Sequence, residues 1–290
     1  MRDEVPGAPS EITPHGSRFT FGERLHLRAH GTAGQPTLIH LPGLHGDWTL
    51  LAPFRHALNR RARLVESAYP HAPGWQLADY AAAIESVLLE HSITSGWLLG
   101  ESFSSQIAWA FLERQQHAGD AARFRIEGLI LVGGFVRHPW PWGVRLAHAA
   151  SRRASVRFIR RACTFYARTM SKRFGHCPGA DDEFAQFIEN RASDPDRHAI
   201  TRRYLLIAGN HPAATARATR LPVFHLSGAW DPIVPWWQVR PWLRQHCPGY
   251  RGSRIIWSGD HNILLSAPEK SAEQILAWVK ETGGGETSSG

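Results

Sequence analysis

The surroundings of one serine suggest chemistry more directly than any other feature of the sequence. Ser102 follows the apolar run 97–100 and precedes Ser104 and Ser105, where a segment with helical periodicity begins. A strand-to-helix turn this tight forces its central residue into a strained backbone conformation, which lifts the side chain clear of both elements. The hydroxyl of Ser102 is therefore a candidate nucleophile.

The turn differs at one position from the Gly-x-Ser-x-Gly pattern of such nucleophiles, because Ser104 stands where a second glycine is usual. Serine is still small enough to let a helix approach the strand closely. The same short pattern also occurs in strand-to-helix turns that have no catalytic role. Its interpretation therefore depends on residues further along the chain.

A serine nucleophile requires a base, and the base requires a carboxylate that orients it. Two later segments place these groups just after an apolar strand: Asp231 follows 222–226, and His261 follows 254–257. Catalytic groups of open parallel sheets gather at the carboxyl ends of the strands, so the three side chains are expected to converge there. Asp260 adjoins His261, but neighbouring residues in a turn rarely orient each other, which favours Asp231 as the acid.

Strand and helix patterns alternate along most of the chain, which predicts an α/β fold with a mainly parallel sheet and helices on both faces. An antiparallel hairpin is expected over 18–30, where apolar and polar residues alternate. Further strands are expected over 37–41, 62–67, 97–100, 126–132, 222–226 and 254–257. Helices are expected over about 48–60, over 77–88, after Ser102 and around 275–279.

The alternation stops between residues 137 and 220, which carry several arginine-rich helical stretches and no clear strand. We therefore expect a core of residues 1–136 and 221–282, a helical cap of residues 137–220 and a flexible tail of residues 283–290. The cap segment holds 16 Lys or Arg and 6 Asp or Glu, a net charge of +10 within a chain of +8. This charge either attracts an anionic substrate, a phosphate group such as that of coenzyme A or an acidic membrane surface, or it is a solvated helical face.

The composition indicates an ordinary globular enzyme, which we expect to be cytoplasmic. Of the 290 residues, 43% are hydrophobic and 20% are charged. No window approaches the about 18 apolar residues of a membrane span, and the N-terminus lacks the apolar run of a secretory signal. Three dispersed cysteines fit a reducing compartment better than a disulfide framework. The seventeen histidines form no spaced ligand cluster and the glycines no phosphate loop, so we expect no metal and no cofactor. We also expect no nucleic-acid partner.

Four short motifs lie at the ends of predicted strands. They are Leu-Pro-Gly-Leu-His-Gly-Asp (41–47), Gly-Glu-Ser-Phe-Ser (100–104), Ser-Gly-Ala-Trp-Asp-Pro-Ile-Val-Pro (227–235) and Gly-Asp-His-Asn (259–262). Each alone is unspecific, but together and in this order they resemble the α/β-hydrolase family over about residues 37–281.

This resemblance implies a Ser-Asp-His triad. Ser102 would be the nucleophile, His261 the general base and then acid, and Asp231 the carboxylate that holds the imidazole. It also implies an oxyanion hole made of two backbone N–H groups, those of Phe103 and Leu44. Against the family pattern, Pro241 is expected to interrupt the helix that usually follows the acid.

Several residues near the motifs have two interpretations. His45, Trp48 and Trp230 border the predicted pocket, and they either contact substrate or are ordinary loop and core residues. Glu101 is expected beside the sheet or towards the pocket. His40 and His225 occupy strand interiors and are predicted to be buried histidines without a catalytic role.

The most direct functional hypothesis is a serine hydrolase that cleaves an ester or thioester of a small to medium, apolar acyl group through an acyl-enzyme on Ser102. The partner is then a small-molecule acyl substrate. Apolar residues of the cap either accommodate the acyl group or form the cap's own core: Trp140, Trp142, Phe158, Phe165, Tyr166 and Phe174. The same triad also serves acyl transfer, carbon–carbon hydrolysis and lyase chemistry, and the fold also hosts ligand-binding proteins without activity. The sequence leaves the oligomeric state open.

Overall fold

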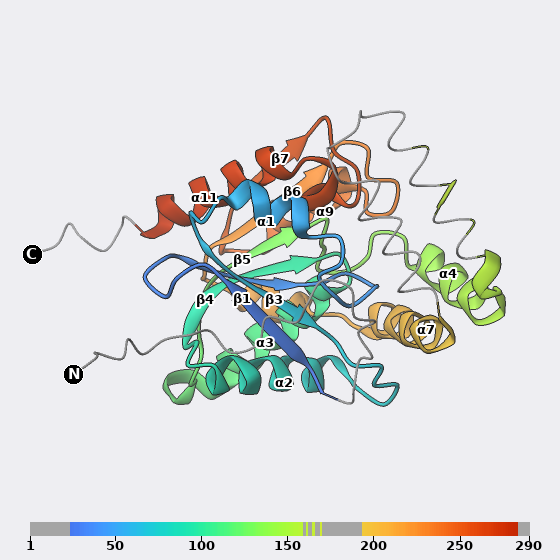
Figure 1. Cartoon of the computed structure of the whole chain (residues 1–290), viewed down its shortest axis with the longest axis horizontal. Coiled ribbons are helices and arrows are strands. Elements are labelled where there is room, and N and C mark those ends of the chain that lie inside the picture. Colours follow the sequence, from blue (N-terminus) through green and yellow to red (C-terminus); the bar gives the residue numbers. More distant parts are fainter. Residues whose placement is uncertain (1–23, 159–160, 162–163, 166–168, 170–192, 284–290) are drawn as a thin grey trace, which may run out of the picture.

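Seven strands form one sheet in the order β1-β3-β2-β4-β5-β6-β7, in which all strands but β1 run parallel (Figure 1). The computed structural model describes residues 24–158, 161, 164–165, 169 and 193–283. The strands are β1 (His26–His30), β2 (Thr37–Leu41), β3 (Arg63–Ala68), β4 (Ser95–Glu101), β5 (Arg125–Val132), β6 (Val223–Gly228) and β7 (Tyr250–Ile256). The predicted α/β architecture with a mainly parallel sheet is confirmed.

The edge strand β1 pairs antiparallel with β3. The sequence pattern predicted a hairpin over 18–30, of which residues 18–23 lie outside the described residues. A charge cluster joins β1 to its neighbours: the buried carboxylate of Glu66 on β3 pairs with Arg28 of β1 and, at 2.7 Å, with Arg55 of α1 (Ala52–Leu58). The partner of β1 is thus fixed by residues far from it in sequence.

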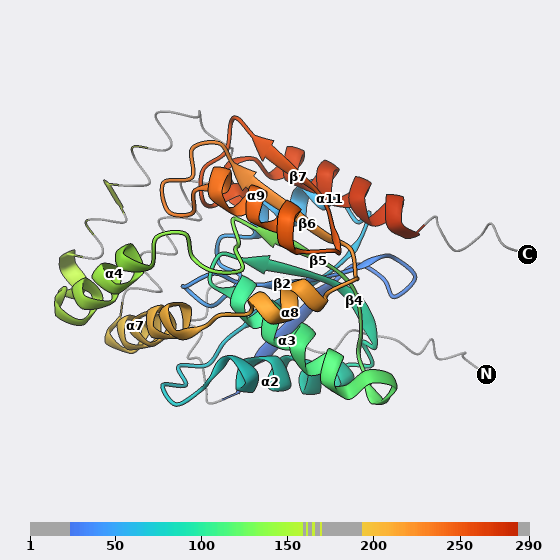
Figure 2. The ribbon, with the colours of Figure 1, turned by 180° about the vertical axis from the view of Figure 1, so that it is seen from behind.

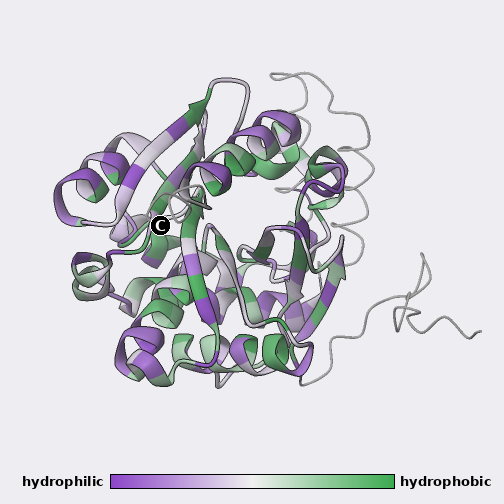
Figure 3. Cartoon of the chain, turned by 90° about the vertical axis from the view of Figure 1, so that its left-hand side faces the viewer, coloured by the Kyte–Doolittle hydropathy of each residue, from purple (hydrophilic) through white to green (hydrophobic). Residues whose placement is uncertain are grey.

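Helices cover both faces of the sheet (Figures 1 and 2). One face carries α1, α10 (Ile263–Ser266) and α11 (Pro268–Gly283), and the other carries α2 (Leu77–Glu90), α3 (Ser104–Ala118), α8 (Ala213–Ala218) and α9 (Trp236–His246). Side chains of a strand alternate between these two cores: Leu38 and Leu99 face the first, while Ile39 and Leu98 face the second. Figure 3 shows that the helices combine hydrophobic and hydrophilic residues, as expected for helices with one side on the sheet and the other in solvent.

The segment between β5 and β6 contributes helices that lie away from the sheet. Helices α4 (Pro141–Arg153) and α7 (Asp194–Gly209) pack against each other beyond the carboxyl ends of the strands (Figure 1). Helix α8, by contrast, contacts α3, and Gln116 of α3 donates to Thr219 at 3.2 Å. In the part of the chain that the structure describes, no helix is long and apolar enough to cross a membrane.

Helix α9 contradicts one prediction, because it continues through Pro241 from Trp236 to His246. Proline removes one backbone donor and leaves the carbonyl four residues earlier without its helical partner. That carbonyl belongs to Trp237, whose side chain is 50% exposed, and Pro241 is itself exposed. Water can satisfy the freed carbonyl, so the helix tolerates the proline.

Candidate active site

The turn after β4 holds Ser102 in a left-handed backbone conformation, with φ at +48°. Its N–H donates to the carbonyl of Val132 at 2.9 Å, and its carbonyl accepts from the N–H of Ser105 at 3.0 Å. Helix α3 approaches the strand so closely that a Cβ on Gly100 would lie 3.1 Å from the Cα of Ser105. This is the sharp strand-to-helix turn that the sequence pattern predicted, and it lifts the serine side chain towards the carboxyl edge of the sheet.

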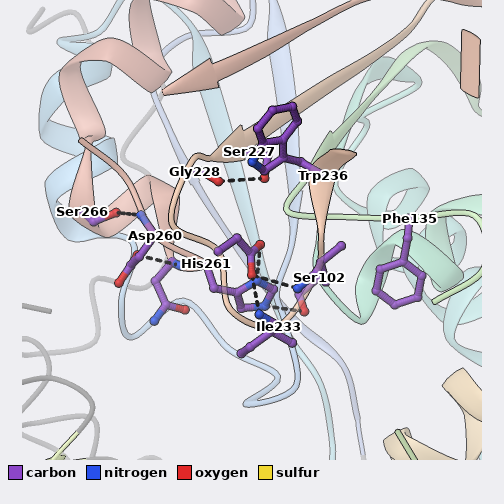
Figure 4. Close-up of polar contacts among 12 residues, drawn as sticks. Ser102, Phe135, Ser227, Gly228, Ile233, Trp236, Asp260, His261 and Ser266 are labelled. Carbon is purple, nitrogen blue, oxygen red and sulfur yellow. Dashed lines mark hydrogen bonds and ion pairs between the residues drawn. The ribbon is translucent and has the colours of Figure 1, made fainter. Parts of the chain in front are cut away.

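The structure brings Ser102, His261 and Asp231 into one hydrogen-bonded chain. Figure 4 labels Ser102 and His261 of this chain. The Oγ of Ser102 lies 2.9 Å from Nε2 of His261, and Nδ1 of His261 lies 2.7 Å from Oδ2 of Asp231. Asp231 follows β6 and His261 follows β7, so the three groups come from three strand ends. All three residues are buried.

The backbone around Asp231 fixes the direction of its carboxylate. Its Oδ1 accepts from the N–H groups of Ile233 and Val234, both at 2.8 Å, which leaves Oδ2 to face the imidazole. Gly133, which follows β5, lies close to the hydrogen-bonded pair of His261 and Asp231. Its φ is +53°, and a Cβ there would lie 3.4 Å from Nδ1 of His261. A glycine meets both needs, since it tolerates the left-handed conformation and occupies no side-chain space.

Asp260, the residue before His261, forms hydrogen bonds within its own turn. Its Oδ1 accepts from the N–H of Asn262 at 2.9 Å, and its N–H donates to Ser266 at 3.1 Å. Figure 4 shows Asp260 and Ser266 on the side of His261 that is turned away from Ser102. The structure therefore pairs the imidazole with Asp231 and not with its sequence neighbour.

Electrostatics around His261 favour its charged form. Burial alone would lower the pKa of the imidazole, but the charge and hydrogen bond of Asp231 raise it above its usual value, and Glu101 and Asp260 add to the effect. An imidazole between a hydroxyl and a fixed carboxylate can accept the hydroxyl proton, and the carboxylate stabilises the imidazolium that results.

A second buried histidine, His138, follows β5 and was missed by sequence reasoning. Burial and the nearby charge of His261 lower the pKa of its imidazole to about 4.

The turn that follows β2 lies beside the serine, since a Cβ on Gly43 would lie 3.7 Å from the Cβ of Ser102. We call residues 42–46 the β2 loop. Within it, the N–H of Gly46 donates to the carbonyl of Gly43 at 3.0 Å. The N–H of Tyr69 donates to the carbonyl of Gly46 at 2.7 Å, which ties the loop to the end of β3. The loop is thus held by hydrogen bonds on both sides of Leu44.

Glu101 lies behind this loop as a buried anion. Its Oε2 accepts from the N–H of Gly43 at 3.3 Å and lies 3.1 Å from Nε2 of His40. Burial would raise the pKa of this carboxyl, but the hydrogen bond with His40 and the nearby charges of His45 and His261 lower it to about 2. His40 is buried, as predicted, and its ring holds this carboxylate in place.

Ser104, the residue in place of the usual glycine, also holds the loop. Its Oγ donates to the carbonyl of Pro42 and therefore accepts from the hydroxyl of Tyr69, 2.8 Å away. All three groups are buried. The hydroxyl of Ser104 thus joins the start of α3, the end of β3 and the β2 loop, which a glycine would leave unconnected.

The other predicted pocket residues lie in different surroundings. His45 lines a small cavity together with His40, Glu101 and Asn262. Trp48 lies under Arg28, whose guanidinium carbon is 4.3 Å from the ring centroid, so this side chain points towards β1. Trp230 directly precedes Asp231 and is 46% exposed.

Three apolar residues of the predicted cap, Trp142, Phe158 and Phe165, are more than half exposed. They therefore do not form a closed core there. Tyr166 and Phe174 lie outside the described residues, as do Cys163 and Cys177, whereas Cys247 is a buried free thiol. Among the residues that the structure describes, no three His, Cys, Asp or Glu side chains gather as a metal site.

The fold is shared with many solved structures. An esterase from Exiguobacterium antarcticum superposes with a TM-score of 0.70 at 14% identity, over 88% of this chain and 95% of that one. An enol-lactonase from Burkholderia xenovorans LB400 superposes with a TM-score of 0.70 at 16% identity, over 88% of this chain and 96% of the other. The chain has the α/β-hydrolase fold.

A third α/β-hydrolase structure, a malate-bound esterase from Thermogutta terrifontis, matches with a TM-score of 0.66 at 20% identity, over 89% of this chain and 93% of its own. No family model matches the sequence, and no curated protein is similar to it in sequence. At identities this low the likeness establishes the α/β-hydrolase fold alone, so the chemistry has to be argued from the site.

Proposed function

We propose that the chain is a serine hydrolase that cleaves an ester or thioester of a small to medium, apolar acyl group through an acyl-enzyme on Ser102. The observation that carries this proposal is the hydrogen-bonded chain from Ser102 through His261 to Asp231. The left-handed backbone at Ser102 supports the proposal, because strained backbone conformations cluster at active sites, where the surrounding structure holds them in place.

In the acylation step, Nε2 of His261 takes the proton of the Ser102 hydroxyl while Oγ attacks the carbonyl carbon of the substrate. The tetrahedral intermediate then collapses, and His261 returns the proton to the leaving alcohol or thiol. Asp231 stays ionised and stabilises the imidazolium. In the second step His261 activates a water molecule, which releases the carboxylic acid and regenerates the serine.

The negative charge of the tetrahedral intermediate needs donors, and the backbone N–H groups of Phe103 and Leu44 are the candidates. Phe103 precedes α3, so its N–H belongs to the positive end of the helix. Leu44 belongs to the β2 loop, which approaches Ser102 through Gly43. Loss of one such donor typically raises the barrier by about 3 kcal/mol.

An apolar acyl group fits the side chains next to the triad. Trp230 and Ile233 flank Asp231, and each is almost half exposed, at 46% and 45%. Ile233 lies beside His261 in Figure 4. Exposed apolar side chains at a polar site are a common way to bind an apolar ligand. The structural neighbours named above, two esterases and an enol-lactonase, agree with cleavage of an ester bond.

A fluorophosphonate probe tests the proposal, because it reacts with an activated serine. We expect labelling of the wild-type protein, no labelling of Ser102→Ala, and unchanged labelling of Ser86→Ala, an exposed serine of α2. Turnover of aryl esters and thioesters of graded acyl length then defines the substrate. A folded wild-type protein that neither reacts with the probe nor turns over any of these substrates would overturn the proposal.

A further inference from the structure

Arg203 is a buried charge whose setting calls for an explanation. It belongs to α7, in the segment between β5 and β6 that we call the insertion. Arg203 is only 2% exposed. Arginine is almost never fully buried unless it is paired. Within the described part of the chain Arg203 forms no ion pair with a carboxylate, and its Nε has no hydrogen-bond partner.

The guanidinium of Arg203 contacts the β2 loop. Its Nη1 donates to the carbonyl of Leu44 at 2.6 Å. Its Cζ lies 5.5 Å from the ring centroid of Tyr69 and 5.9 Å from that of Phe103. The charge is therefore balanced by one carbonyl and two aromatic faces, all of them next to the proposed oxyanion hole.

The loop is shaped to receive this group. Gly46 has a φ of +83°, and a Cβ there would lie 2.4 Å from Nη1 and 2.6 Å from Nη2 of Arg203. Any side chain at position 46 would occupy the space that the guanidinium fills. Glycine at this position thus permits the backbone turn and the close approach of the arginine together.

Docking of the insertion does not by itself explain the contact. Helix α7 also contacts the core through Asp196, whose carboxylate lies 2.9 Å from Nε2 of His71. That contact involves neither the β2 loop nor the triad. Arg203, by contrast, holds the carbonyl of the residue whose N–H is the proposed oxyanion donor.

We propose that Arg203 is a positioning residue: by holding the Leu44 carbonyl it restricts the backbone torsions of Leu44 and so directs the Leu44 N–H towards the oxygen of the substrate carbonyl. The inference rests on the proposed function of the site. It makes the insertion part of the catalytic geometry, because a side chain of α7 sets the conformation of a loop that belongs to the sheet. Small misplacements of such donors have large effects on rate, and a shift of 1 Å can cost about 100-fold.

The test compares Arg203→Met, which keeps the length but removes charge and donors, with Arg203→Lys, which keeps one charged donor. We expect kcat to fall about 10- to 100-fold in Arg203→Met and less in Arg203→Lys, with KM within about threefold of wild type, because the donor acts mainly in the transition state. The rate of fluorophosphonate labelling should fall in the same order. Partial recovery by the lysine variant is a readout that a purely structural role would not give.

His71→Gln is the matched control, since it alters a different contact between α7 and the core, that of His71 with Asp196. We expect it to lower Tm without a selective loss of kcat. The inference is overturned if the arginine variants keep the wild-type kcat and labelling rate, or if their losses only follow Tm as in His71→Gln. Should Arg203→Met fail to fold, the kcat of Arg203→Lys decides: a wild-type value overturns the inference, and a reduced value at unchanged KM supports it. If the wild-type protein itself is not labelled, it is the proposed function that fails.

Discussion

Two buried carboxylates act on the imidazole of His261 in different ways. Asp231 forms a direct hydrogen bond, whereas Glu101 acts through its charge alone and is bonded to His40 and Gly43. Both raise the pKa of His261. The proposed mechanism requires neutral imidazole, so activity is lost as pH falls through this raised pKa. The acid limb of the kcat/KM profile should therefore lie above about 6.5, the usual value for histidine.

Glu101→Gln tests the contribution of charge at a distance. The amide oxygen of glutamine can still accept from His40 and Gly43, but the negative charge is gone. We expect the acid limb of kcat/KM to move to lower pH than in the wild type, because the neutral imidazole then persists to lower pH. A pH profile of ester hydrolysis measures this shift. An unmoved or upward-shifted limb in a folded variant would contradict the assignment.

At the scale of elements, the hydroxyl of Ser104 connects α3, β3 and the β2 loop through Tyr69 and Pro42. Ser104→Ala would leave the Pro42 carbonyl and the Tyr69 hydroxyl buried without this partner, at a cost of about 1–3 kcal/mol in the free energy of unfolding. We expect kcat to fall as well, since the loop loses a tether close to Gly43. Ser104→Gly, which restores the usual glycine of the pattern, should not recover activity.

Chemical denaturation and ester turnover of both Ser104 variants check this prediction. Ser86→Ala serves as control, because the exposed hydroxyl of Ser86 donates to Glu90 on the surface of the same helix. A Ser104→Gly variant as stable and active as the wild type would show that the connection is dispensable.

The end of β5 offers a second test with a close control. Gly133 and Gly119 both have a positive φ, at +53° and +54°. A Cβ on Gly133 meets His261 and Asp231, whereas a Cβ on Gly119 has no atom within 4 Å. A positive φ is unfavourable for alanine at either position, so both variants should lose stability. Only Gly133→Ala should also lose kcat, by about tenfold from a displaced His–Asp pair. Equal kcat in the two variants would rule this out.

The sequence predicted the alternation of strands and helices because each pattern is local, but it missed features that depend on distant partners. Strand β7 begins at Tyr250, earlier than predicted, because this edge strand carries exposed polar residues. The convergence of Ser102, Asp231 and His261 followed from their places at strand ends. The contacts of Ser104 and Arg203 had no such signal, since their partners lie far away in the chain and no periodicity marks them.

For the molecule as a whole, acid stability should depend on Glu66 and Glu101. Burial would raise the pKa of each, but ionic and hydrogen-bond partners lower both to about 2. A carboxyl with a lowered folded-state pKa contributes stability above its unfolded value of about 4.3 and loses it as pH falls towards the folded value. We expect the free energy of unfolding to drop steeply between about pH 4 and pH 2.

Urea denaturation across this pH range measures the drop. Glu66→Gln should be less stable than the wild type at neutral pH, because Arg28 and Arg55 lose their common partner, and its stability should change less with acid. A wild type whose stability is constant down to pH 2 would contradict the prediction.

The fit between Arg203 and Gly46 limits how this protein can be engineered. Exchange of the inserted helices for those of another protein with the same fold would leave a hollow over Gly46, unless the donor supplies an arginine at the equivalent turn of its helix. Chimeras should therefore transplant helix and loop as one unit, and a library that varies substrate preference through the insertion should keep positions 46 and 203 constant.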